Sequence, residues 1–160
     1  MHRYQLADDD VVSKIADIIK TDFPYLEGAN ICTLFDTKKR MRERRIVLAS
    51  IKATNNFEAF LSSYMSGGSG YDYFIFIDHL LWTNVIDSED DRTRLIRHEL
   101  KHAYVVQTDD GPVFKTGPHE IEDFYSEQSR NQDAKEWKER LAASLFRRYE
   151  QIKDKQRKLF

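Results

Sequence analysis

The segment His98-Glu99-Leu100-Lys101-His102 has two histidines four residues apart, with a glutamate directly after the first. On a helix of 3.6 residues per turn, His98 and His102 project from one face, so both imidazoles can reach a single Zn²⁺ at about 2.0–2.1 Å. Glu99 lies about 100° further round the helix, beside the ion rather than bound to it. That is the position of a general base that takes a proton from a zinc-activated water. The motif therefore predicts a catalytic zinc site and a metallopeptidase.

A catalytic zinc normally has three protein ligands and one open position for water, so one more ligand is needed. We favour His119, because it follows a Gly117-Pro118 turn that can bring it back over the motif helix. Glu122 and Asp123 could orient the second ring nitrogen of His119, or one of them could be the ligand in its place. Less favoured ligands are Asp109 and Asp110. The remaining histidines, His2 and His79, are expected in surface or structural roles.

The motif requires a helix, and the flanking residues predict one over about residues 88–107. Asp87-Ser88-Glu89-Asp90-Asp91 supplies a cap and an acidic first turn, in which Ser88 to Asp91 resembles a capping box. Thr108-Asp109-Asp110-Gly111-Pro112 is expected to stop the helix. Its core face, opposite the histidines, consists of Ile96, Leu100, Ala103 and Tyr104.

Hydrophobic periodicity predicts the elements around this helix. We expect an amphipathic helix over 10–20, an antiparallel pair of strands over 30–36 and 45–53, and a buried strand over 71–78. Shorter elements are a helix over 57–65, a strand or hairpin arm over 113–115 and a helix opened by Pro118. A C-terminal helix is indicated by the spacing of Trp137, Leu141, Leu145 and Ile152.

Further residues before and after the motif complete a pattern. A strand ending near Ile77 and then Trp82 precede the motif, and the segment His119-Glu120-Ile121-Glu122-Asp123-Phe124 follows it. Over about residues 28–130 the chain resembles the putative phage metallopeptidase family, whose members typically have a His-Glu-Leu-x-His helix followed by His-Asp-x-Glu-Glu-Phe. Glu120 and Asp123 are charge-preserving departures from that second motif. The resemblance implies a compact zincin-like fold and peptide hydrolysis, without naming a substrate. A weaker similarity is to SprT-like proteases, which process proteins attached to DNA.

Composition bounds the architecture and the compartment. The 160 residues suit one domain, with a core over about 10–130 and a basic amphipathic C-terminal helix over 131–160. The single cysteine, Cys32, excludes an internal disulfide and fits a reducing compartment. We see no signal peptide and no apolar run near the roughly 18 residues that span a bilayer. We therefore expect no membrane partner, and a cytoplasmic protein of a bacterial cell or of a phage-infected host.

Charge is unevenly distributed along the chain. Residues 135–160 contain nine Lys or Arg against four Asp or Glu, a balance of +5 that leaves −7 for residues 1–134. A second basic run, residues 38–45, separates two expected strands. Such runs are more often solvated faces than binding sites, but segments 38–45 and 135–158 are the candidates for contact with nucleic acid or an acidic protein.

We therefore predict an α+β, zincin-like minimal metallopeptidase domain, with a small, mostly antiparallel sheet packed on the motif helix and a helical C-terminus. In the expected reaction Zn²⁺ polarises the scissile carbonyl of a peptide or protein substrate, and Glu99 deprotonates water and protonates the leaving amine. An edge strand could hold the substrate by β-augmentation, with 45–53 and 71–78 as candidates. The oxyanion partner is left open, because Tyr104 and Tyr125 are near the motif only in sequence.

The alternative hypothesis is a nucleic-acid- or protein-binding regulatory module, of phage or mobile-element origin, in which zinc is not catalytic. Structural zinc sites usually have four protein ligands and favour cysteine. Cys32 stands alone and far from the motif, so the peptidase hypothesis is preferred.

Overall fold

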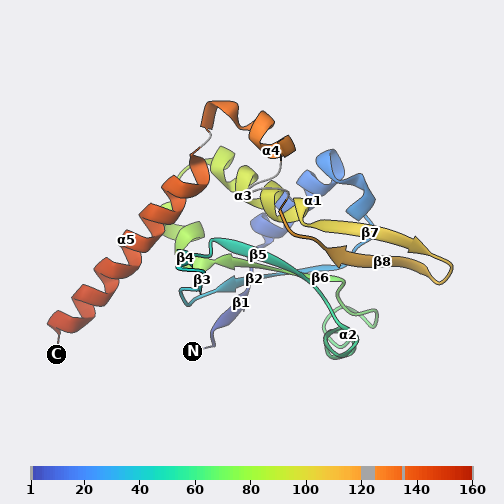
Figure 1. Ribbon diagram of the computed structural model, residues 1–160. Helices are drawn as coiled ribbons and strands as arrows, with labels where there is room; N and C mark the ends of the chain where they lie inside the picture. Colours follow the sequence, from blue (N-terminus) through green and yellow to red (C-terminus); the bar gives the residue numbers. More distant parts are fainter. Residues whose placement is uncertain (1, 120–124, 135, 160) are drawn as a thin grey trace.

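The centre of the molecule is a four-stranded mixed sheet, seen in a computed structural model that describes residues 2–119, 125–134 and 136–159 (Figure 1). Its strand order is β1 (Tyr4–Leu6), β2 (Ile31–Asp36), β6 (Tyr73–Asp78) and β5 (Ala49–Ala53). The central pair β2–β6 is parallel, and the two outer pairs are antiparallel. The α+β class is confirmed. The expected antiparallel pairing of 30–36 with 45–53 is wrong, because β6 lies between these strands.

Two helices cover one face of this sheet (Figure 1). They are α1 (Asp9–Asp22), close to the range expected from its periodicity, and α3 (Glu89–Lys101), which carries the motif. Alternate residues of β6 point into this layer, and Tyr73, Ile75 and Ile77 are all at most 2% exposed. They pack in one core with apolar side chains of α1 and α3, including Val11, Ile15, Leu95 and Leu100. The motif helix is thus held along its apolar side by the sheet.

The motif helix is shorter than the sequence indicated. The expected helix over 88–107 is correct at its start, where the Ser88 side chain accepts a hydrogen bond from the Asp91 amide at 3.1 Å. It is wrong beyond Lys101, because β7 (Ala103–Thr108) and β8 (Gly111–Thr116) form an antiparallel hairpin. The β-branched and aromatic residues of β7 favour a strand, and Asp110-Gly111 is a hairpin turn signal. Gly111 has φ 109°, which favours glycine.

The remaining elements surround this core. They are the 3₁₀ turn Pro24–Leu26, the small hairpin β3 (Met41–Arg42) and β4 (Arg45–Ile46), α2 (Asn56–Ser62), the π turn η2 (Leu81–Val85), α4 (Tyr125–Arg130), the 3₁₀ turn Gln132–Ala134 and α5 (Trp137–Lys158). The basic run 38–45 therefore forms its own hairpin. The helix expected to open at Pro118 falls largely on residues 120–124, outside the described residues. Strand β1 was missed because it has three residues.

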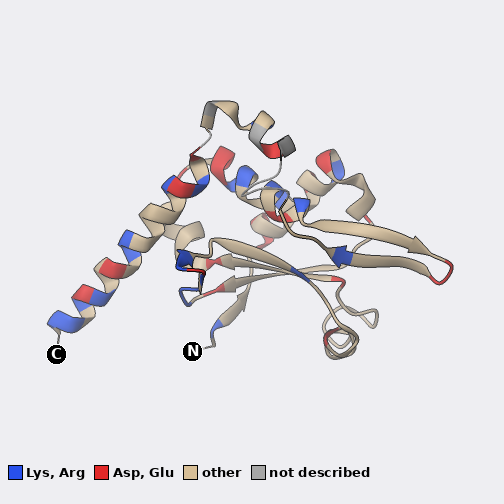
Figure 2. Ribbon diagram, viewed as in Figure 1, with Lys and Arg blue, Asp and Glu red and all other residues tan. Residues whose placement is uncertain are grey.

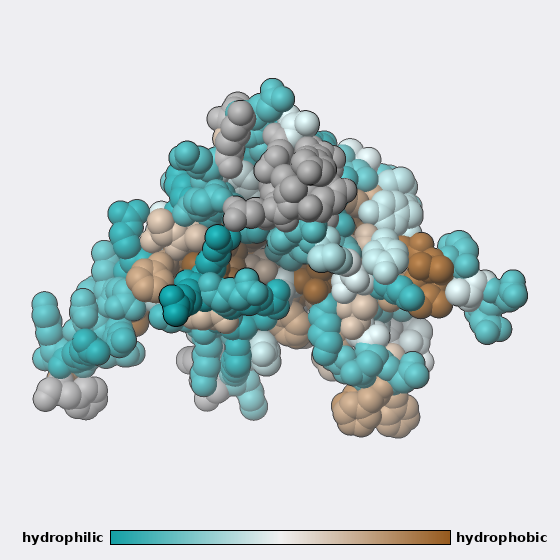
Figure 3. All heavy atoms as spheres, in the orientation of Figure 1, coloured by the Kyte–Doolittle hydropathy of each residue, from teal (hydrophilic) through white to brown (hydrophobic). Residues whose placement is uncertain are grey.

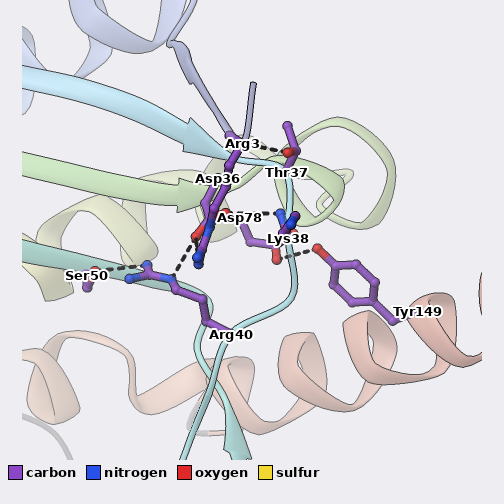
Figure 4. A network of polar contacts seen from close by, with 8 residues as sticks. All are labelled: Arg3, Asp36, Thr37, Lys38, Arg40, Ser50, Asp78 and Tyr149. Atoms are coloured by element: carbon purple, nitrogen blue, oxygen red, sulfur yellow. Dashed lines mark hydrogen bonds and ion pairs between the residues drawn. The ribbon is translucent and has the colours of Figure 1, made fainter. Parts of the chain in front are cut away.

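Helix α5 is fastened to the body of the protein at the buried carboxylate of Asp78 (Figure 4). The Tyr149 hydroxyl donates to Asp78 Oδ2 at 2.7 Å, and Asp78 is 3% exposed at the end of β6. Beside it, Asp36 at the end of β2 accepts from Arg3 and Arg40 at 2.9 and 3.1 Å. Trp137, Leu141 and Leu145 are buried, whereas every side chain over 151–159 is exposed. Only the first part of α5 therefore packs on the body.

Within the described ranges, no helix combines the length and the apolar character needed to cross a membrane.

Candidate metal centre

Three histidines from two parts of the chain meet at the end of the motif helix. His98 lies in the last turn of α3, His102 is its C-cap, and His119 follows β8. One ring nitrogen from each histidine lies within 4.8 Å of the other two. A tetrahedral zinc with bonds of about 2.0–2.1 Å would separate its nitrogen ligands by roughly 3.3 Å. The three side chains are thus close to the spacing of a three-histidine metal site.

The hairpin β7–β8 is the device that brings His119 to the motif helix. Its register pairs Ala103 with Thr116, so the residues just outside it, His102 and Gly117, are side by side. The Gly117 amide donates to the His102 carbonyl at 2.8 Å. His119 is only two residues further on, and its Nε2 reaches 2.9 Å from His98 Nε2. A strand hairpin, and not a helix that continues past His102, therefore closes the site.

Gly117 also orients the ring of His102. The His102 Nδ1 lies 2.6 Å from the Gly117 carbonyl oxygen, which can only accept a hydrogen bond. This contact places the ring proton on Nδ1 and leaves Nε2 as the lone-pair nitrogen. Metal-binding histidines commonly have their second nitrogen fixed in this way by a carbonyl or carboxylate. The donor set therefore fits a divalent ion that accepts imidazole, a group that includes zinc, copper, iron and nickel.

The motif is embedded more deeply than a surface helix would allow. His98 is 1% exposed and Glu99 7% exposed, while His102 is half-buried. The neighbouring Arg97 is also buried, and it donates to Glu127 Oε2 at 3.1 Å and to Asn131 Oδ1 at 3.0 Å. A buried, hydrogen-bonded ion pair thus ties α4 to α3 directly beside the histidines.

Helix α5 contributes a residue that sequence reasoning missed. The Lys138 Nζ lies 3.2 Å from His98 Nε2, and the Trp137 ring lies 6.2 Å from the His98 ring. We expected the basic C-terminal segment to pack or to recruit a partner, not to reach the site. Helical spacing marks Trp137 as a core residue but gives no sign that the next residue faces the histidines.

Other residues considered as ligands lie elsewhere. Asp109 and Asp110 are exposed at the tip of the hairpin β7–β8. The full length of both strands, six residues each, separates them from the histidines. His79 packs its ring 5.1 Å from that of Phe35, and His2 is exposed. Glu122 and Asp123 lie outside the described residues.

Comparison with known proteins identifies a family. The family model described as putative phage metallopeptidase matches residues 3–145. The chain belongs to this family. The match extends well beyond the 28–130 expected from the motifs, and it takes in the first turns of α5 and hence Lys138. No curated protein and no solved structure matches the chain significantly.

Proposed function

We propose that this phage metallopeptidase family member is a zinc-dependent peptidase whose metal is held by His98, His102 and His119. The observation that carries the proposal is the convergence of the three ring nitrogens within 4.8 Å. Three histidines with an open fourth position are typical of catalytic rather than structural zinc. A bound zinc ion would supply Lewis-acid chemistry and lower the pKa of a water molecule to about 7.

Glu99 is the proposed general base. It follows His98 on the same helix turn and is 7% exposed, so its carboxylate works in a poorly hydrated environment. It would accept a proton from the attacking water and deliver it to the nitrogen of the leaving amine. Proton transfer of this kind contributes about 10²–10⁴-fold to rates, which sets the loss expected when the carboxylate is replaced by an amide.

Lys138 is the proposed donor to the carbonyl oxygen of the scissile peptide. Its ammonium group lies 3.2 Å from His98 Nε2, so it would stand next to a metal held by that nitrogen and to a substrate carbonyl bound there. Negative charge develops on that oxygen during hydrolysis, and a cation already in place stabilises it. Tyr104, the nearer tyrosine in sequence, is exposed on β7.

The substrate is proposed to be an extended peptide that pairs with β5. This strand is at the edge of the sheet, whereas β6, the other candidate, is interior. β5 also contacts the motif helix α3 and the hairpin strand β8. Main-chain hydrogen bonds to an edge strand would align a peptide with little dependence on its sequence.

Elemental analysis of the purified protein tests the metal centre. We expect about one Zn²⁺ per chain in the wild type and in a His79→Ala control, which removes a histidine outside the cluster. His119→Ala should lower zinc affinity by far more than the 10–100-fold typical of a residue that only orients a ligand. If His119→Ala kept its zinc while Glu122→Gln or Asp123→Asn lost it, a carboxylate would be the third ligand and the three-histidine site would be wrong.

A further inference from the structure

The two basic segments of the chain meet in the folded protein. Lys39, before the hairpin β3–β4, has its Nζ 3.9 Å from Glu150 Oε1 and 5.3 Å from the centre of the Phe146 ring, both on α5. Strand β4 also contacts α5. In Figure 2 the ribbon of this hairpin is largely blue, the colour of Lys and Arg, and it lies on the side of the sheet towards the helix. Segments about one hundred residues apart thus form one surface, which we call the basic end: residues 38–45 and 146–159.

This surface concentrates the positive charge of the protein. The basic end contains twelve Lys or Arg against three Asp or Glu, a balance of +9, and the whole chain has −2, which leaves −11 for all other residues. Arg40 is partly engaged with the buried Asp36, but Arg42, Arg44 and all of 151–159 are exposed. Figure 3 shows the projecting part of α5 as a hydrophilic arm. An electrostatic field with positive charge at one end and negative charge elsewhere would attract a polyanion to the basic end.

One side of α5 is a continuous polar stripe. At 100° per residue, six side chains of the last four turns fall within about 100° of the helix circumference, and none is acidic or apolar. They are Ser144, Arg147, Arg148, Gln151, Lys155 and Lys158. The nearest carboxylate, Asp154, lies about 20° outside this window. The four cations extend over roughly 16 Å of helix at 1.5 Å per residue, a distance that spans several phosphates of one strand.

A groove lies at the N-terminal end of this stripe. It has a volume of about 320 Å³ and lies between α5 and the turn η2. Its walls are formed by Asn84, Val85, Ser144, Arg147, Arg148 and Gln151. Two guanidinium groups, two amides and a hydroxyl are the donors that proteins most often present to phosphate and sugar oxygens. The stripe therefore combines net charge with a shaped set of hydrogen-bond donors.

Two charged residues at the tip of the hairpin β3–β4 adopt a strained backbone conformation. Glu43 and Arg44 have φ values of 50° and 64°, in the left-handed region that turns of this kind usually fill with Asn-Gly. Glycine would relieve this strain at position 44. An arginine there projects a guanidinium from the tip of the basic end instead.

We propose that the basic end binds the sugar-phosphate backbone of a nucleic acid, with the stripe on α5 as the main contact. A protein partner is less well matched, because protein interfaces have an apolar, aromatic core and are depleted in lysine, whereas this stripe has neither property. The contacts predicted are to phosphates, so binding is independent of sequence. The inference does not depend on zinc or on peptidase activity.

Fluorescence anisotropy with a labelled 20-base-pair duplex tests the proposal on the full chain. A slope near −0.9 per phosphate in log K against log salt means that each contact contributes about tenfold at 0.1 M salt. Arg147→Gln/Arg148→Gln/Lys155→Gln should therefore weaken binding by at least 100-fold and reduce the slope by about 2–3. The matched control, Lys20→Gln/Lys52→Gln/Lys115→Gln, removes three exposed lysines from other faces and should change affinity by about twofold or less.

A second variant separates binding from folding. Arg44→Gly should raise the thermal midpoint, because it relieves a left-handed residue, and yet weaken duplex binding by several-fold. Failure of the wild type to bind at 50 mM salt, or an equal loss in the control, would overturn the proposal. Tighter binding of a poly-glutamate of equal charge than of the duplex would overturn it in favour of an acidic protein.

Discussion

Replacing Tyr149 by phenylalanine should loosen the junction between α5 and the sheet. The hydroxyl donates at 2.7 Å to Asp78 Oδ2, and the other carboxylate oxygen accepts from the Leu81 amide at 2.8 Å. Asp78 is 3% exposed, so water cannot readily replace the lost donor. A hydrogen bond to a buried charged group contributes about 1.5–3 kcal/mol. For a domain of this size, a loss of about 2 kcal/mol lowers the melting midpoint by roughly 4–8 °C.

The pH dependence of this loss is characteristic. Burial raises the pKa of Asp78, and the Tyr149 hydrogen bond opposes that rise by favouring the carboxylate. Tyr149→Phe should raise the pKa of Asp78 further in the folded protein. A carboxyl whose folded pKa exceeds its unfolded value costs nothing below the unfolded value, near pH 4, and its cost grows as pH rises from the unfolded to the folded value. The variant should therefore lose less stability near pH 4 than at pH 8.

Urea unfolding followed by circular dichroism measures both quantities. Tyr64→Phe, at a residue 82% exposed, is the matched control and should change the free energy of unfolding by less than about 0.5 kcal/mol. A loss below that value at pH 8 for Tyr149→Phe would refute the reasoning. So would a loss of the same size near pH 4.

Two further predictions concern the surroundings of the histidines. Lys138→Met should tighten zinc binding several-fold in a competition titration, because it removes a cation beside His98. The same variant should lower kcat by about 10²-fold or more. Unchanged zinc affinity would contradict the placement of Lys138 beside the metal. Glu127→Gln should lower the free energy of unfolding by about 3–5 kcal/mol, because it leaves the charge of the buried Arg97 without Glu127. In the same urea titration, the double variant Arg97→Met/Glu127→Met should recover most of this loss. A double variant as unstable as the single one would show that packing, and not the unpaired charge, causes the effect.

Local signals in the sequence predicted local structure well. The start of the motif helix follows from Ser88, whose side chain caps it as expected. The apolar periodicity of residues 10–20 and of 71–78 predicted α1 and β6 correctly. His119 lies close to His98, but the reversal of the chain that brings it there is the hairpin β7–β8 and not a turn at Gly117-Pro118. Each of these features depends on neighbours within a few residues or on one short reversal of the chain.

Features that depend on contacts between distant segments were not predictable in this way. The hydrophobic periodicity of one segment does not show that β6 inserts between β2 and β5. Which strands pair depends on side chains from all three segments. The end of the motif helix was misjudged because Ala103 and Tyr104 fit a helical stripe as well as a strand, and pairing with β8 decides between them. Lys138 reaches His98 only because the start of α5 lies beside α3, and the sequence of one helix does not show which helix lies beside it.

Hydrolysis by the Glu99→Gln variant tests the central claim most directly. The amide keeps the shape of the side chain and the three histidines but cannot accept the proton of the attacking water. Zinc-loaded wild type and variant should be compared by mass spectrometry of a broad peptide library, with metal content measured on the same samples. The account predicts cleavage by the wild type, an equal metal content in both proteins and a rate at least about 10²-fold lower in the variant. Cleavage by Glu99→Gln at the wild-type rate, or no cleavage by a fully metal-loaded wild type, would contradict it.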